Sequence, residues 1–113
     1  MYGNEYSNDE GTLYLLAGQS GSSNSRIKFY TSGTNSLILE YNGHLTPANT
    51  NTYDLVKLCI RWRYIYTNDL HLSNEGSSND IDGSWGNWTI QEGESDLFLK
   101  NNRSGKKLSL IHI

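Results

Sequence analysis

The sequence RIKFYTSGTNSLILEY, residues 26–41, alternates apolar and polar side chains before a short polar turn and returns as a second apolar run. Within Arg26–Thr31, Ile27 and Phe29 alternate with two basic residues and a tyrosine. An alternation with a period of two is typical of a half-buried strand. We therefore predict a β-hairpin, with its turn at Ser32–Asn35 and its returning strand at Ser36–Tyr41.

The composition of the whole chain favours the same class of structure. Gly, Ser, Asn and Thr make up well over a third of the 113 residues, and no segment shows a 3.6-residue apolar repeat. This is too much turn chemistry for a helical bundle or a doubly wound α/β domain. We predict an all-β fold of short antiparallel hairpins that ends in a β-meander. Its strands are expected at Trp88–Gln91, at Asp96–Lys100 and from Lys106 onward.

Three more strands are expected, one before the hairpin and two between the hairpin and the meander. They lie at Thr12–Ala17, Arg61–Thr67 and Leu70–Leu72. In Arg61–Thr67 the large aromatic residues occupy alternate positions, which predicts that they share one face of a strand. Asn42-Gly43 is a strong turn dipeptide, because both residues tolerate a positive φ.

A Leu-x-Leu pattern occurs at residues 13/15, 37/39, 70/72 and 97/99. The last two copies lie in similar hexamers, DLHLSN at 69–74 and DLFLKN at 96–101. Alternate leucines place both side chains on one face of a strand. We expect the following residues in a core or a subunit interface: Trp62, Tyr64, Tyr66, Leu70, Leu72, Leu97 and Leu99. The hydrophobic fraction is only 35%, so we expect three chains to share the core that one chain cannot fill.

Charge and cysteine content argue against several kinds of partner. The net charge is −3 and the pI is about 5.5, so no global basic field attracts nucleic acid. No apolar run approaches the ~20 residues of a membrane span, so membrane insertion is not expected. Cys59 stands alone and the histidines are far apart, without zinc-ligand spacing. Residues 79–83 faintly resemble a calcium loop, but Thr89 occupies the position of the bidentate Glu, and an Asx-rich loop is expected instead. We therefore expect neither a metal nor a cofactor.

Catalytic signatures are absent from the sequence. It contains no G-x-S-x-G elbow, no glycine-rich phosphate loop before a helix and no identifiable pair of catalytic carboxylates. We therefore expect a protein that is not an enzyme. Trp85 and Trp88, with Asn87 and Asp82 nearby, are candidates for glycan contact, and the alternative is that both indoles only pack against the protein. For the basic and aromatic residues 61–66, nucleic-acid contact and packing are the corresponding alternatives.

Two segments carry a resemblance to a known family. PANTNTYDL at Pro47–Leu55 and RWRYIYTNDLHLSN at Arg61–Asn74 resemble a module in the distal segments of bacteriophage tail fibres and related virion proteins, particularly those of marine phages. Asn79–Lys107 is similar to the segment that comes after that module in those proteins. The resemblance implies a non-catalytic, homotrimeric fibre segment that is assembled in the cytoplasm of the bacterial host and displayed on the virion. Its implied partners are copies of itself, other virion proteins and a host-surface glycan.

The chain departs from that family pattern in two places. Val56–Ile60 is apolar where the family has a Gly/Ser-rich turn, and Leu108–Ile113 (LSLIHI) replaces an aromatic-containing strand. LSLIHI is also the translation of a common sequencing adapter, so we hypothesise that residues 108–113 are not native sequence. The expected organisation is a polar lead-in at 1–11, a hairpin unit at 12–43, the tail-fibre-like module at 44–107 and this tail.

Two other functions remain open on the sequence alone. One is a carbohydrate-binding β module that uses Trp85 and Trp88. The other is a fragment of a polysaccharide-degrading tailspike, whose catalytic acids would lie outside this chain.

Overall fold

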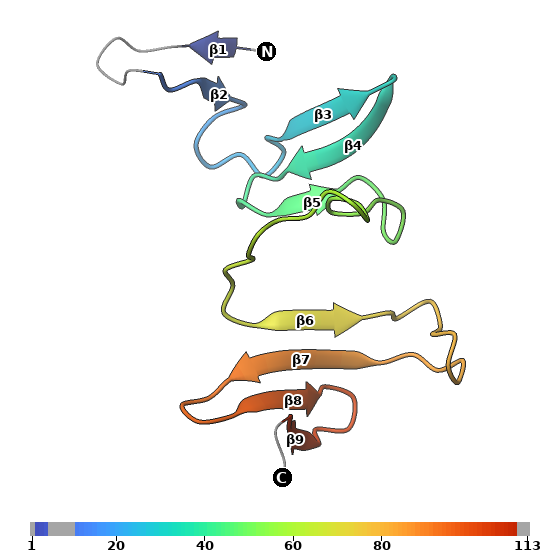
Figure 1. The fold of residues 1–113 in the computed structure, drawn as a ribbon. Helices are drawn as coiled ribbons and strands as arrows, with labels where there is room; N and C mark the ends of the chain where they lie inside the picture. The colour runs from blue at the N-terminus through green and yellow to red at the C-terminus, as the bar shows by residue number, and fades with distance from the viewer. Residues whose placement is uncertain (1, 5–10, 111–113) are drawn as a thin grey trace. The chain divides into compact units, whose positions relative to one another are not determined.

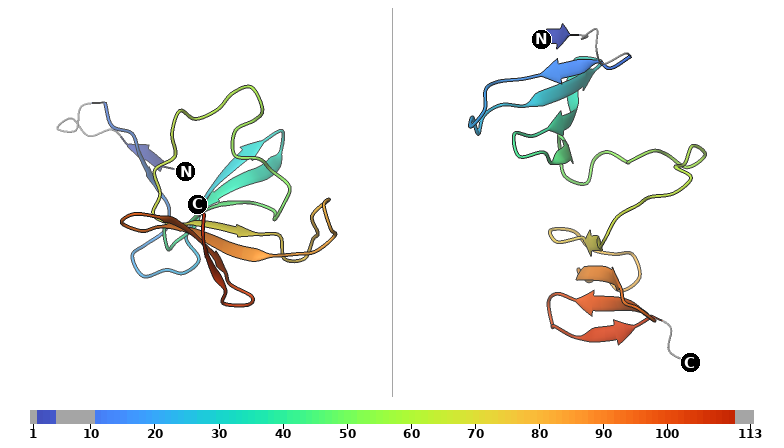
Figure 2. Two further views of the ribbon diagram at one scale, coloured as in Figure 1. Left: turned by 60° about the horizontal axis from the view of Figure 1, so that its bottom comes forward. Right: turned by 90° about the vertical axis from the view of Figure 1, so that its left-hand side faces the viewer.

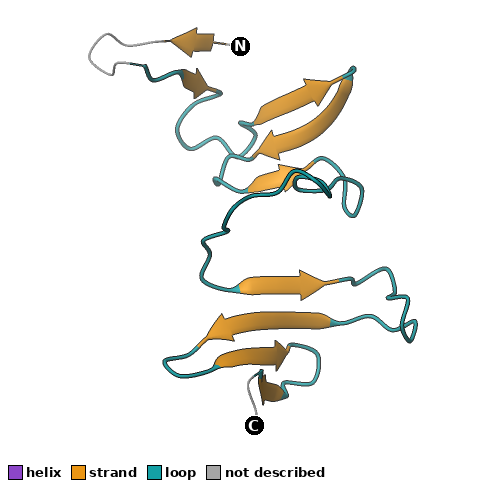
Figure 3. Ribbon diagram, in the orientation of Figure 1, coloured by secondary structure: helices purple, strands orange, loops and turns teal. Residues whose placement is uncertain are grey.

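Every strand pair in the computed structural model is antiparallel and joins strands that are consecutive in sequence (Figures 1 and 3). The structure describes residues 2–4 and 11–110, and these residues contain nine strands and no helix. The prediction of an all-β fold is therefore confirmed. Since no helix is present, none of the described residues forms an apolar helix of the length that crosses a bilayer.

The chain divides into two compact units, residues 1–61 and 62–113, which are described separately. The first unit contains a two-stranded sheet and a three-stranded sheet. The two-stranded sheet joins β1 (Tyr2–Asn4) to β2 (Tyr14–Leu16). The three-stranded sheet has the order β3 (Ile27–Thr31), β4 (Thr34–Leu39) and β5 (Leu45–Pro47).

The hairpin predicted at residues 26–41 is confirmed as β3 and β4, with a tighter turn than expected. Thr31 pairs directly with Thr34, so only Ser32 and Gly33 form the loop. Their φ values are 50° and 74°, and a type I′ turn requires a positive φ at both central residues. Such a turn suits the right-handed twist of the two strands, and the pairing therefore extends two residues further than the sequence indicated.

The turn predicted at Asn42-Gly43 is also present, and it extends the first unit beyond residue 43. The Gly43 amide donates to the Glu40 carbonyl at 2.9 Å, and the Glu40 amide donates to the His44 carbonyl at 2.9 Å. This turn returns the chain as β5 along β4. Residues 45–47 thus belong to the hairpin sheet, whereas the sequence suggested a domain boundary between residues 43 and 44.

The strand predicted at Arg61–Thr67 is wrong. Residues 61–69 form no strand, and β6 begins only at Leu70. The alternation of aromatic residues is real, but no neighbouring strand satisfies the backbone of this segment. Just before it, Val56 has a φ of 72°, an unusual conformation for a β-branched residue. Lys57 and Ile60 then pair through an isolated bridge, so residues 56–60 form a turn and neither a helix nor a strand.

The predicted meander is present in the second unit, and the strand predicted at Leu70–Leu72 joins it as a fourth strand. Its strands follow one another in the order β6 (Leu70–Ser73), β7 (Asn87–Glu92), β8 (Leu97–Asn101) and β9 (Lys107–Ser109). In β9, Leu108 and Ser109 pair with Leu99 and Phe98, so part of the suspected tail lies in the sheet. The Leu110 amide donates to the Leu97 carbonyl at 2.7 Å, and residues 111–113, the end of that tail, lie outside the described residues.

In the three-stranded and the four-stranded sheets, the register of strand pairing places apolar side chains together on one face. Directly opposed residues in an antiparallel pair point to the same side. Leu70, Ile90, Leu99 and Leu108 are opposed across the four strands of the meander. One register step away, His71, Thr89, Lys100 and Lys107 lie on the other face. The Leu-x-Leu pairs at 37/39, 70/72 and 97/99 each lie on one face of a strand, as the alternation predicted.

No layer within either unit covers these apolar faces. The four strands of the meander form one sheet, and the right-hand view of Figure 2 shows them one after another. Among the described residues no hydrophobic side chain is buried, and the only buried residue is Thr89, at 9% exposure. The apolar face of the three-stranded sheet carries Phe29 and Leu45, which are also exposed.

The residues expected in a core are therefore not buried within the chain. Trp62 and Tyr66 are 65% and 90% exposed, and Leu97 and Leu99 are only half-buried. Tyr64, Leu70 and Leu72 are also exposed. Each sheet has one layer only, so a single chain forms no core around these residues. A place in a subunit interface stays a prediction for all seven residues.

Candidate functional site: a cleft at one end of the meander

Two loops meet at one end of the β6–β9 meander. In an antiparallel meander alternate connections lie at the same end, so the β6–β7 loop and the β8–β9 loop are neighbours (Figure 1). Between them they carry Trp85, Asn102 and Arg103. The topology therefore brings together side chains that are 17 and 18 positions apart in sequence.

The β6–β7 loop, residues 74–86, is closed by two asparagine side chains. Asn74 accepts a hydrogen bond from the Gly86 amide through Oδ1 at 2.7 Å, and the Asn74 amide donates to the Gly86 carbonyl at 3.3 Å. Inside the loop, Oδ1 of Asn79 accepts from the amides of Ile81 and Asp82 at 2.8 and 2.9 Å. These contacts confirm the Asx-rich loop predicted here. They also fix the backbone of the loop on either side of Trp85.

Asp82 completes the loop through its carboxylate. Its Oδ1 accepts from the Ser84 hydroxyl at 2.7 Å, from the Ser84 amide at 3.0 Å and from Nδ2 of Asn79 at 2.9 Å. The hydrogen bonds from the Ser84 side chain and backbone, followed by that from Asn79, hold the pKa of Asp82 below its usual range. Asp82 is therefore a loop-organising residue whose acceptor oxygen already has three donors.

The β8–β9 loop is a tight turn organised by Asn101. Oδ1 of Asn101 accepts from the amides of Arg103 and Ser104 at 3.0 and 3.3 Å. The Asn101 carbonyl accepts from the amide of Gly105, whose φ is +79°. A glycine adopts this left-handed conformation at little cost. The turn thereby fixes the backbone from which the Arg103 side chain extends.

Arg103 joins the two loops. Its Nη1 donates to the Trp85 carbonyl at 2.8 Å, and its guanidinium carbon lies 3.8 Å from the centroid of the Trp85 ring. Its neighbour Asn102 ties the β8–β9 loop to β7, because its Nδ2 donates to Oδ1 of Asn87 at 3.0 Å and to Oγ1 of Thr89 at 2.9 Å. Hydrogen bonds with a charged donor and cation–π stacking are both stronger than neutral surface contacts.

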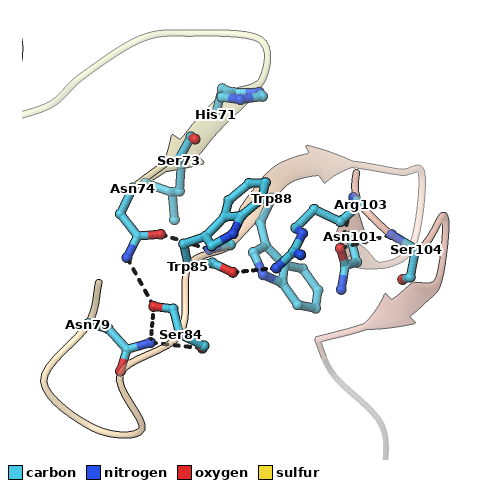
Figure 4. A pocket seen from close by; sticks show the side chains of 12 residues that line it. His71, Ser73, Asn74, Asn79, Ser84, Trp85, Trp88, Asn101, Arg103 and Ser104 are labelled. Carbon is cyan, nitrogen blue, oxygen red and sulfur yellow. Dashed lines mark hydrogen bonds between the residues drawn. The ribbon is translucent and has the colours of Figure 1, made fainter. Parts of the chain in front are cut away.

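The space between these loops is a cleft of about 930 Å³. In Figure 4, Asn74, Asn79 and Ser84 lie on one side, Arg103, Asn101 and Ser104 lie on the other, and the two tryptophans lie between them. Trp88 lies against Gly86: a Cβ at Gly86 would lie 3.0 Å from Nε1 of the indole. The glycine therefore lets the indole approach the backbone at the base of the loop.

The structure brings together two of the four residues considered for glycan contact. Trp85 and Trp88 both line the cleft and are half-buried. Asn87 and Asp82 are not among its lining residues, and their side-chain oxygens bind Asn102 and the loop itself. Sequence reasoning missed Arg103, for which the only sequence signal was a basic residue in the turn after a Leu-x-Leu strand.

The side chains that line the cleft can contact a ligand in several ways. Its lining combines indole surface, which offers apolar contact, with amide and hydroxyl groups and one guanidinium, which offer hydrogen bonds. Within residues 2–4 and 11–110, no group of three His, Cys, Asp or Glu side chains is placed to hold a metal ion. The free thiol of Cys59 is exposed, in the first unit.

Comparison with known proteins finds no relative of this chain. The chain matches no protein-family model, no curated protein and no solved structure.

Proposed function

We propose that this chain is a non-catalytic segment of a bacteriophage tail fibre, which works as a homotrimer on the virion. Copies of itself and other virion proteins are its structural partners, and the cleft of the second unit contacts a glycan on the host surface. The proposal rests on the resemblance of Pro47–Leu55 and Arg61–Asn74 to tail-fibre modules and on one structural observation, the uncovered apolar faces.

Self-association is supported by how much apolar surface the sheets leave exposed. Leu70 is 49% exposed on the apolar face of the meander, beside half-buried Ile90 and Leu99. These three residues do not line the cleft, whereas Leu72 and Trp88 on the same face do. Full burial of a Leu or Ile side chain contributes roughly 1.5–3 kcal/mol. A single-layer sheet in which no apolar side chain is fully buried gains little free energy to offset the conformational entropy that is lost on folding. When several copies pack face to face, these side chains become buried and the loss is offset.

The test is the oligomeric state of the full chain by sedimentation equilibrium. We expect a trimer whose thermal midpoint rises with chain concentration, because association and folding are linked. The variant Leu99→Lys places a charge on the apolar face and is expected to dissociate the trimer. Gln91→Lys places the same charge on the other face and is its matched control. A folded monomer at all concentrations contradicts the proposal.

A carbohydrate-binding module that does not form a fibre is the second candidate. It is favoured by the convergence of Trp85, Trp88 and Arg103 on one cleft. Its signature is a chain that sediments as a monomer and still binds a glycan with a change in tryptophan fluorescence. The two functions therefore differ in oligomeric state and share the cleft.

A further inference from the structure

We propose that the cleft recognises an acidic saccharide, with Arg103 binding the sugar carboxylate while the sugar ring packs on Trp88. This inference rests on the glycan-contact role proposed above, and it names the class of ligand. The structural basis is the juxtaposition of one guanidinium, one accessible indole and several amide groups around a single cleft.

The charge of the cleft wall favours an anion. Arg103 is the only Lys, Arg, Asp or Glu among the residues that line the cleft. The nearest acidic residue of the loop, Asp82, lies outside that lining, and its Oδ1 already accepts three hydrogen bonds. A lone cation in a concave surface attracts a negative ligand group, and a guanidinium matches the two oxygens of a carboxylate.

Trp85 holds the guanidinium in place. The Arg103 side chain is fixed by ring stacking at 3.8 Å and by the hydrogen bond from Nη1 to the Trp85 carbonyl. That bond uses one of the five N–H donors of the guanidinium. A side chain that is already ordered loses less entropy when a ligand binds, so the stacking favours recognition by the remaining donors. Trp85 is therefore a positioning residue for Arg103.

We assign Trp88 as the indole on which the sugar ring packs. One face of the Trp85 ring is covered by Arg103, whereas no cation covers Trp88 among the described residues. An apolar indole face suits the C–H face of a pyranose ring. Asn101 lies beside Arg103 in Figure 4, and its Oδ1 is used by the turn while its amide NH₂ is a further donor for a ligand oxygen.

The test compares two ligands that have the same sugar rings and differ in whether their carboxyl groups are charged or methylated. Tetragalacturonate and its methyl ester have the same rings, but only the first carries carboxylates. We expect the full-length chain to bind the acid form with a saturable change in tryptophan fluorescence, and to bind the ester at least about tenfold more weakly, the loss of roughly one charge-assisted hydrogen bond. Binding should also weaken from 0.05 to 0.5 M NaCl, because salt screens exposed charges. Equal affinity for the two forms, or no binding of either, overturns the inference.

A pair of arginine variants assigns the effect to the cleft. Arg103→Gln is expected to lose the preference for the acid form, whereas Arg63→Gln retains it, since Arg63 lies over Tyr64 and not in the cleft. Preference retained in Arg103→Gln contradicts the assignment. If that variant does not fold, the comparison of acid and ester on the unaltered chain decides alone. Sedimentation of the same sample separates the two proposals: a trimer without sugar binding overturns this inference only, and a sugar-binding monomer overturns the fibre only.

Discussion

The guanidinium of Arg103 lies 3.8 Å from the ring centroid of Trp85 and donates to the carbonyl of the same residue at 2.8 Å. One side chain thus contacts both the ring and the backbone of a residue 18 positions earlier in the sequence. This contact links the β8–β9 turn to the β6–β7 loop, and it shapes the cleft between them. The stability of the second unit should therefore depend on it.

Removal of this contact should loosen the second unit. Arg103→Ala loses a stacking contact worth about 0.5–1 kcal/mol at an exposed site and a charged hydrogen bond worth about 1.5–3 kcal/mol, offset in part by water. We expect the free energy of unfolding to fall by about 1–2 kcal/mol, measured by urea denaturation followed by tryptophan fluorescence. In Arg63→Ala, which lacks a comparable hydrogen bond, the fall should stay below about 0.5 kcal/mol. Equal effects in the two variants would refute the role of the Arg103–Trp85 contact.

The loop around Asp82 should respond to acid. Because hydrogen bonds from Ser84 and Asn79 lower the pKa of Asp82 in the folded state, the ionised carboxylate stabilises the loop. That contribution is present above the pKa of the unfolded chain and is lost as the pH falls through the lower, folded pKa. We expect the NMR shift of the Ser84 amide to titrate with a midpoint below the usual range for Asp. Asp82→Asn should abolish the titration, and a midpoint in or above the usual range would contradict the assignment.

Lys100 and Lys107 are directly opposed across β8 and β9 on one face of the sheet. Like charges in this position are unfavourable, whereas opposite charges contribute roughly 0.2–1 kcal/mol. Lys107→Glu is therefore expected to raise the free energy of unfolding by about 0.5–1 kcal/mol at a fixed chain concentration. Lys106→Glu changes the net charge by the same amount without facing Lys100, so a similar gain there would show that net charge, and not the cross-strand pair, is responsible.

Gly86 gives a way to move Trp88 without removing it. A Cβ at residue 86 would lie 3.0 Å from Nε1 and 3.1 Å from Cδ1 of the indole, closer than ordinary van der Waals contact. Gly86→Ala should displace the ring, shift the tryptophan emission maximum and leave the far-UV circular dichroism unchanged. Gly93→Ala meets Phe98 at the other end of the sheet and serves as control. An unchanged emission spectrum in Gly86→Ala would mean that the indole does not lie against the glycine.

The strands that sequence reasoning placed correctly are those with both an alternating pattern and a strong turn. Residues 26–41 and the meander from residue 87 onward have turn residues on either side of each apolar run, so local sequence fixes both the strand and its partner. Arg61–Thr67 has the alternation without a flanking turn that returns the chain. Period-two patterning shows which side chains share a face, but a strand also needs a neighbouring backbone to bind.

The cleft was only half foreseeable for a similar reason. Trp85 and Trp88 are close in sequence and attract notice together, whereas Arg103 reaches Trp85 only through the pairing of β7 with β8. Asp82 and Asn87 were chosen for their polarity and proximity, yet their oxygens serve the loop and Asn102. Sequence proximity identifies the residues of a loop, and tertiary pairing decides which of their polar groups stay available to a ligand.

The pairing of each strand with its neighbour in sequence has a kinetic consequence. Each hairpin closes a short loop, so the entropy lost before the first native contact forms is small, and chains with mostly local contacts fold fast. Every such pair can form as soon as its second strand has left the ribosome. For the proposed trimer, encounter between chains would then be the slow step, and its rate would depend on expression level. If the proposed trimer forms, its yield should therefore be limited by the collision of chains whose strands are already paired and whose leucines are exposed.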